Sequence, residues 1–167
     1  MTLIANSVHS LFPTSEVGQS TTPESIMNTD CHIIVIDDHE IIATGCQGEF
    51  AKAGLPWTVT WARSLSDIDW PEGRTLAILD LRLNDGSRPA EIIAELSRRS
   101  IPVVVYTSGE DPKRIREAIA ADVMAIVNKT APIEELIEAV KAALKGEPSG
   151  SIDWARAQLI KMIWNKK

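Results

Sequence analysis

The sequence predicts an α/β fold in which a five-stranded parallel sheet is covered by helices on both faces. Three observations carry this prediction. Five short apolar runs alternate with stretches of helical pattern between residues 31 and 147. Most of these runs are apolar throughout, which is typical of parallel strands that are buried on both sides. Two of them end in aspartate, at the carboxyl edge where open α/β sheets bind their ligands.

In the first half of this region, apolar or β-branched runs predict strands, and glycine and proline mark where helices stop. Gly54 closes the first helix, and Pro71 leaves the second helical stretch room for only about two turns. Asn84-Asp85-Gly86 marks a turn after the central strand. The expected elements are a strand over 33–37, a helix over 40–53, a strand over 58–61, two helical turns over 64–70 and a strand over 76–81.

In the second half, capping residues define the helices more sharply. Asp111 is a good N-cap and Pro112 fits the first helical turn, while Pro132 opens the last helix and Gly146 closes it. The run over 101–106, before the first of these helices, is rich in β-branched residues and predicts a strand. The expected elements are a helix over 89–99, a strand over 101–106, a helix over 112–121, a strand over 124–127 and a helix over 132–145.

The two ends of the chain are expected to lie outside the main domain, which we place at residues 30–147. Residues 1–29 are rich in serine and threonine, contain two prolines and lack periodicity, so we expect a disordered tail. Residues 148–167 predict a helix from Ser151 to Trp164 with one apolar side, or the start of a linker.

Composition and charge limit the class of protein. The chain has 167 residues, of which 44% are hydrophobic and 24% charged, as in ordinary globular proteins. Residues 30–147 carry 20 acidic against 13 basic side chains, a net charge of −7, whereas residues 148–167 carry 1 against 4, a net charge of +3. The main domain therefore lacks the basic surface that nucleic acids attract, and only the C-terminal tip is basic.

Cysteine content and hydropathy indicate the compartment. Cys31 and Cys46 are too few to suggest a disulfide framework, so we expect two free thiols in a reducing cytosol. No apolar run reaches the length of a membrane span, and the first 30 residues contain no lysine or arginine to begin a signal peptide. We therefore expect a cytoplasmic protein that has no membrane partner.

Polar side chains end or follow several of the predicted strands, and they should meet at one rim of the sheet. Three crowded carboxylates raise one another's pKa and weaken a fold unless a cation lies among them. Ligands that are all oxygens suit Mg²⁺, which takes one or two carboxylates and completes its shell with water and phosphate oxygens. The rim residues are Asp37 and Asp38 at the end of the first strand, Asp80 at the end of the third, Thr107 just past the fourth and Lys129 just past the fifth.

These rim residues and their spacing resemble the signature of the receiver domain of two-component response regulators. The intervals from Asp38 onward are 42, 27 and 22 residues. The stretches Val35-Ile36-Asp37-Asp38-His39-Glu40 and Asp80-Leu81-Arg82-Leu83-Asn84-Asp85-Gly86-Ser87 are most similar to the NarL/LuxR-type subgroup. The resemblance covers residues 31–147 and implies a flavodoxin-like (CheY-like) doubly wound sheet with strand order 2-1-3-4-5.

The resemblance also implies a function. Asp80 would be the phosphoacceptor, which receives a phosphoryl group from a sensor histidine kinase, with Lys129 and Thr107 as the catalytic residues. Mg²⁺ would be held by Asp37, Asp38, Asp80 and the backbone carbonyl of Arg82. Such a domain is no enzyme in the usual sense, although it assists its own phosphorylation and dephosphorylation. It would signal by changing conformation or forming a homodimer, and would reach DNA only through an output domain that this chain does not contain.

Departures from the family pattern leave an alternative open. Receivers usually carry a tyrosine or phenylalanine three residues before the lysine, where this chain has Ile126, so an aromatic switch would have to come from Tyr106 or be absent. The alternative is a phosphorylation-independent receiver that acts as a protein–protein interaction module. A small hydrolase that uses Asp80 as nucleophile is a third reading. The chain has no glycine-rich phosphate loop for a nucleotidase, and His39 has no second histidine or cysteine at ligand spacing.

Overall fold

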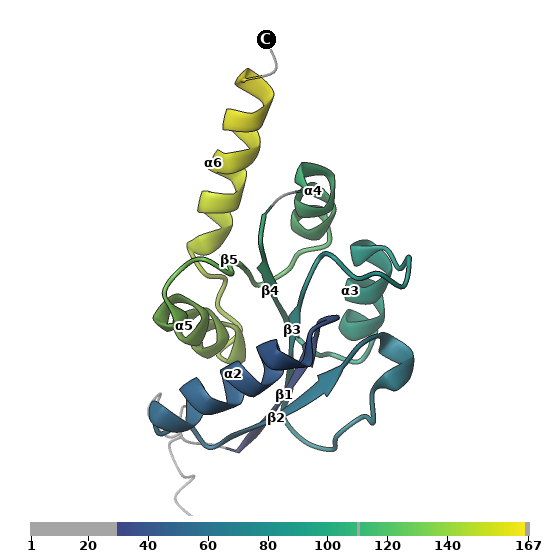
Figure 1. The fold of residues 1–167 in the computed structure, drawn as a ribbon, viewed down its shortest axis with the longest axis vertical. Helices are drawn as coiled ribbons and strands as arrows, with labels where there is room; N and C mark the ends of the chain where they lie inside the picture. Colours follow the sequence, from purple (N-terminus) through teal and green to yellow (C-terminus); the bar gives the residue numbers. More distant parts are fainter. Residues whose placement is uncertain (1–29, 110, 166–167) are drawn as a thin grey trace, which may run out of the picture.

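The computed structural model describes residues 30–109 and 111–165, and it confirms the predicted α/β class. Five parallel strands form one sheet in the order β2-β1-β3-β4-β5 (Figure 1). The expected tail over 1–29 lies outside the described residues. The strands are β1 (Cys31–Ile36), β2 (Trp57–Ala62), β3 (Thr75–Leu79), β4 (Val103–Thr107) and β5 (Ala125–Asn128). The helices are α2 (Glu40–Lys52), α3 (Pro89–Arg98), α4 (Pro112–Ala120), α5 (Ile133–Leu144) and α6 (Ser151–Trp164).

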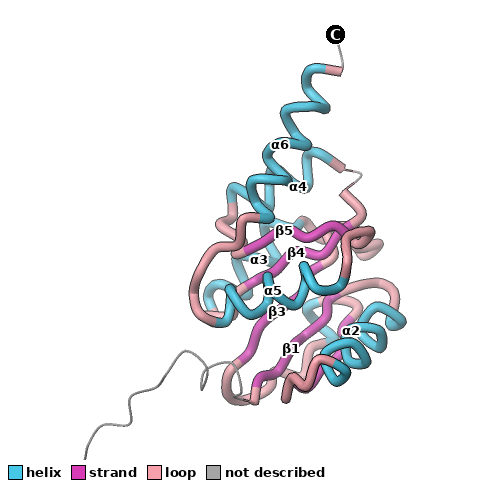
Figure 2. The backbone as a smooth tube through the Cα atoms, turned by 90° about the vertical axis from the view of Figure 1, so that its left-hand side faces the viewer, coloured by secondary structure: helices cyan, strands magenta, loops and turns pink. Residues whose placement is uncertain are grey.

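The sheet separates two apolar clusters because successive strand side chains point to opposite faces. Ile33 and Val35 of β1 pack with α2 and α5 on one face, around the fully buried Phe50. Ile34 and Ile36 pack on the other face with α3, α4 and α6. Figures 1 and 2 show the helices on the two sides of the sheet. The central strand β3 is buried along its whole length, which places the acid that follows it at the middle of the carboxyl edge.

The prediction of two helical turns over 64–70 was wrong. The structure has a single 3₁₀ turn, Leu65–Asp67. The hydroxyl of Ser64 lies 3.0 Å from Asp67 Oδ2, and short polar side chains that bond in this way favour turns over helix interiors. Three partly buried side chains nevertheless cover the sheet here in place of a helix: Leu65, Ile68 and Trp70.

Strand boundaries differ from the prediction by one or two residues. β4 starts at Val103 rather than at residue 101, because Pro102 has no N–H to donate to the ladder. Thr107 is thus the last residue of β4 and not the residue after it. Asp80 follows β3 directly, and its N–H donates to the carbonyl of Ile36 at 2.9 Å.

The predicted C-terminal helix is present as α6, and it packs outside the five-stranded sandwich. It contacts β5 and α4, and its later half extends beyond the sheet (Figures 1 and 2). Ala155 and Leu159 are the buried residues of its described side chains. In the part of the chain that the structure describes, no helix is long and apolar enough to cross a membrane.

Candidate acidic site at the carboxyl edge of the sheet

Four rim residues predicted from the sequence come together where β1, β3, β4 and β5 end. Asp37 is 1% exposed, Thr107 is 5% and Asp80 is 7%. Among the described residues the only other buried polar side chain is Thr75, at the start of β3. Burying a carboxylate is costly unless it is paired and hydrogen-bonded, so this concentration of buried polar groups needs a compensating charge.

Lys129 supplies that charge. Its ammonium Nζ lies 2.6 Å from Asp37 Oδ2 and 3.0 Å from Asp80 Oδ2. The backbone N–H of Lys129 donates to the carbonyl of Thr107 at 2.9 Å, which fixes where its side chain starts. Burial alone would lower the pKa of Lys129, but hydrogen bonds to Asp37 and Asp80 and the charges of both carboxylates raise this pKa above its ordinary value. The ammonium therefore stays charged at neutral pH.

Backbone N–H groups hold the remaining carboxylate oxygens. Asp37 Oδ1 accepts from the N–H of His39 at 2.8 Å, and the N–H of Arg82 donates to Asp80 Oδ1 at 3.2 Å. Asp38 is half-buried, and its Oδ2 accepts from the N–H of Asn84 at 2.9 Å. The loop after β3 is thus fastened both to its own acid and to Asp38 after β1.

The donor chemistry of this rim fits Mg²⁺. Asp38, Asp80 and the Arg82 carbonyl offer only oxygen atoms, in a number that this ion accepts with water completing its shell. Within the described ranges no group of three or more histidine, cysteine or acidic side chains stands together as a metal site. A cation here would therefore rely on two direct carboxylates, a carbonyl and water. The ring of His39 faces Asp37, with Nδ1 3.2 Å from Oδ1.

A cavity of about 310 Å³ adjoins the residues that follow Asp80. Thr107 lines it, and the hydroxyl Oγ1 of this residue lies 3.5 Å from the N–H of Gly109, at the limit of a hydrogen bond. Leu81, Arg82 and Arg114 also line the cavity. The carboxylate of Asp111 lines the cavity as well, and it pairs with the guanidinium of Arg114 at 3.3 Å. The cavity thus offers space, hydroxyls and two guanidinium groups, one of them paired, next to the residues that follow Asp80.

Two contacts at the site were not predicted. The indole Nε1 of Trp61, in β2, donates to the backbone carbonyl of Asp37 at 2.7 Å. The guanidinium of Arg114, in α4, donates to the backbone carbonyl of Leu81. Trp61 could have been suspected, because it lies near the carboxyl end of the strand beside β1. No motif or spacing in the sequence indicates the contact of Arg114.

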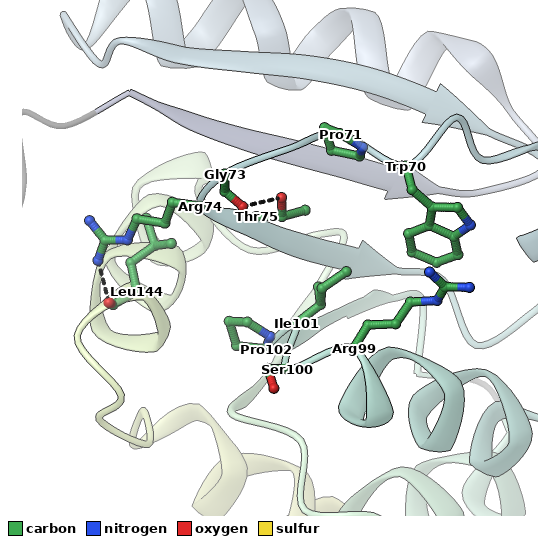
Figure 3. Close-up of a pocket in the computed structure, with 10 residues that line it drawn as sticks. All are labelled: Trp70, Pro71, Gly73, Arg74, Thr75, Arg99, Ser100, Ile101, Pro102 and Leu144. Atoms are coloured by element: carbon green, nitrogen blue, oxygen red, sulfur yellow. Dashed lines mark hydrogen bonds between the residues drawn. The ribbon is translucent and has the colours of Figure 1, made fainter.

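A second cavity, of about 490 Å³, lies at the opposite edge of the sheet (Figure 3). Residues before β3 and β4 line it, and the Arg99 guanidinium stacks 3.9 Å from the centre of the Trp70 ring. Thr75 donates to the carbonyl of Gly73 at 3.1 Å, and Arg74 donates to that of Leu144 (Figure 3). These groups are occupied with one another, so we assign the chemistry to the carboxyl edge.

Solved structures with a similar fold are response regulators. The response regulator ChrA of a heme-sensing two-component system superposes with a TM-score of 0.64 at 23% identity over 78% of this chain and 65% of that one. A LuxR family DNA-binding response regulator from Silicibacter pomeroyi gives 0.57 at 24% identity, over 70% and 93%. The isolated REC domain of RcsB from Salmonella enterica serovar Typhimurium gives 0.59 at 20%, over 76% and 99%.

At these identities the structural likeness shows the fold alone, and the chain spans only 65% of the length of ChrA. A comparison with curated proteins found no match. The model of the response regulator receiver domain matches residues 33–141, which include every rim residue described above. The chain therefore belongs to the response regulator receiver domain family.

Proposed function

We propose that this receiver domain is a phosphoryl-accepting switch in the cytoplasm, in which a sensor histidine kinase phosphorylates Asp80. The observation that carries the proposal is the position of the Lys129 ammonium, which contacts the carboxylates of both Asp37 and Asp80. A buried acid with a cation already in contact is suited to accept an anionic group, because phosphoryl transfer depends mainly on positioning and on charge neutralisation.

The transfer forms one bond and breaks another. An oxygen of the Asp80 carboxylate attacks phosphorus, and the bond between phosphorus and the donor imidazole nitrogen breaks with its electron pair going to that nitrogen. Lys129 neutralises charge on the acceptor side throughout. Mg²⁺, held by Asp38, Asp80 and the Arg82 carbonyl and through water by Asp37, would supply the remaining charge cancellation when bound.

The product is a mixed anhydride whose phosphoryl group carries about −1.5 to −2 charges and three strong acceptor oxygens, in place of the single negative charge of the carboxylate. The Thr107 hydroxyl is free to turn toward such an oxygen, since its contact with the N–H of Gly109 is long at 3.5 Å. Movement of Thr107 displaces the loop that leads into α4, and so changes the surface of α4 and β5.

The proposed output is a change in dimerisation that controls transcription through a DNA-binding domain. Support comes from relatives only: the structures with the same fold include a LuxR family DNA-binding response regulator and RcsB dimers bound to DNA. Residues 30–147 carry a net charge of −7, which disfavours a direct contact of this domain with DNA.

Intact mass spectrometry after incubation with acetyl phosphate and Mg²⁺ tests the proposal. The wild type should gain one phosphoryl group, and Asp80→Asn should gain none. Asp122→Asn is the matched control: Asp122 lies beyond α4 with φ 59°, a conformation that asparagine tolerates equally well, so this variant should label like the wild type. Absence of labelling in the wild type would refute phosphoryl acceptance.

The second candidate is a phosphorylation-independent interaction module. One observation favours it: Ile126 is fully buried where receivers usually carry a mobile aromatic residue, and Tyr106 packs in the cluster on the opposite face of the sheet, with α2 and α5. This candidate predicts an unlabelled wild type and partner binding that Asp80→Asn leaves unchanged.

A further inference from the structure

Helix α6 covers the surface formed by α4 and β5. Ala155 is fully buried and Leu159 is 9% exposed. Both belong to the apolar cluster that contains Ile115 of α4 and Ile126 of β5. Figures 1 and 2 show α6 beside these two elements. Any partner that read the state of the domain at this surface would first have to displace α6.

Among the described side chains of α6, the buried ones are Ala155 and Leu159, which lie about one helical turn apart. Just before the helix, the N–H of Ser149 donates to the carbonyl of Met124 at 3.0 Å, which anchors the linker next to the beginning of β5. Farther along, Ile160 is 57% exposed and Trp164 is 71% exposed. The contacts that these two side chains make can be lost through a small displacement of the surface beneath them.

The first turn of α4 is tied directly to the proposed acceptor. Arg114 donates to the carbonyl of Leu81, the residue after Asp80. Asp111 caps the helix through the N–H groups of Lys113 and Arg114 at 3.0 and 3.4 Å, and its Oδ2 lies 3.3 Å from Arg114 Nε. The acceptor loop, the guanidinium and the start of α4 therefore form one connected unit, with Ile115 of that helix in the cluster that holds α6.

We propose that α6 is the partner that reads the phosphorylation state of Asp80. This inference rests on the proposed function, and it identifies α6 as the element that responds to the phosphoryl group. A phosphoryl group offers charged oxygens that attract a guanidinium more strongly than the neutral Leu81 carbonyl does. When Arg114 leaves Leu81 for these oxygens, the first turn of α4 moves with it. The surface that packs against Ala155 and Leu159 changes shape, and α6 is released.

Hydrogen–deuterium exchange of α6, measured with and without beryllofluoride and Mg²⁺ on the full chain, tests the proposal. Exchange over residues 155–160 should rise by about fivefold or more on activation, the lower end of ordinary coupling between two sites. In parallel, acetyl phosphate labelling of the same preparation is followed by intact mass. Labelled protein with unchanged α6 exchange would overturn this inference and leave the proposed function standing. Unlabelled protein would overturn both.

Two pairs of neighbouring residues provide the variants. Arg114→Gln should still label but should lose the rise in α6 exchange, whereas Arg116→Gln, an exposed arginine on the same helix, should behave like the wild type. A full rise in Arg114→Gln would remove this residue from the account.

Leu159→Ala should raise α6 exchange before activation and lower the beryllofluoride concentration for half-saturation, because coupling is reciprocal. The exposed neighbour variant Ile160→Ala should change neither quantity, and equal effects of the two would contradict the docking.

Discussion

At the scale of single residues, Lys129 is the group on which the rim depends. Its ammonium joins two carboxylates from different strands, and the side chains of Asp37 and Asp80 are only 2% and 8% exposed. Removing one member of a buried ionic cluster leaves the others uncompensated, which costs more than the pair contributes when intact. The same residue would thus stabilise the resting domain and neutralise charge during the proposed phosphoryl transfer.

Lys129→Met should lower the free energy of unfolding by about 2 kcal/mol at neutral pH, below the usual range for buried pairs because the Lys129 side chain is 17% exposed. MgCl₂ should restore part of this loss, since a cation among the acids replaces the ammonium. Urea unfolding with and without MgCl₂ measures both effects. Lys145→Met, at an exposed lysine after α5, is the control, and equal stability of the two variants would contradict the assigned role.

The two buried thiols predict a pH dependence in the alkaline range. Burial raises the pKa of both Cys31 and Cys46 from 9.0 to about 11. The folded state disfavours the thiolate, so the thiols have no effect on the free energy of unfolding below pH 9. Between pH 9 and about 11, each thiol lowers the free energy of unfolding by about 1.4 kcal/mol per pH unit, because the unfolded chain loses the proton first. The double variant Cys31→Ala/Cys46→Ala should show a shallower alkaline decline in urea unfolding. Parallel curves would mean that the thiols do not titrate as buried groups.

At the scale of elements, α4 lies between the proposed acceptor and the C-terminal helix. It has only 9 residues, too few for a helix that is stable on its own, so its geometry depends on its cap and on its packing. The cap is Asp111, whose carboxylate accepts from two N–H groups of the first turn. A short helix held at one end in this way can shift as a unit when the loop before it moves.

Asp111→Ala should lower the free energy of unfolding by about 1 kcal/mol, because two N–H groups of α4 lose their acceptor. Asp111→Asn should retain most of the stability, since asparagine caps helices about as well. Thermal or urea unfolding of the two variants separates the cap from the negative charge. If Asn proved as damaging as Ala, the contribution of Asp111 would lie in its ion pair with Arg114 and not in the cap.

At the scale of the whole molecule, the parallel topology of the sheet gathers the residues of the candidate site at the carboxyl edge. All five strands present their carboxyl ends to one edge, so acids that are far apart in the chain meet there. The second cavity, lined by residues before β3 and β4, holds the stack of Arg99 on Trp70 (Figure 3). Helix α6 contacts the edge strand β5.

The sequence was sufficient for the sheet and for the residues of the rim. Apolar runs of strand length fix the five strands, and the parallel arrangement then places Asp37, Asp80, Thr107 and Lys129 at one edge. The sequence was insufficient for residues 64–70, where weak preferences for helix and for turn compete. The serine and aspartate side chains there favour a turn. The contact of Arg114 with Leu81 joins residues 33 positions apart through a flexible side chain, and no local pattern encodes such a contact.

The most direct test of phosphoryl acceptance is to locate the modified residue. The wild type is incubated with acetyl phosphate and Mg²⁺ and then reduced with borohydride, which converts an acyl phosphate on aspartate to homoserine, before peptide mass spectrometry. We predict homoserine at position 80, none at positions 37, 38 or 85, and no conversion when the donor is omitted. Conversion at another carboxylate, or at none, would contradict the assignment of Asp80 as the phosphoacceptor.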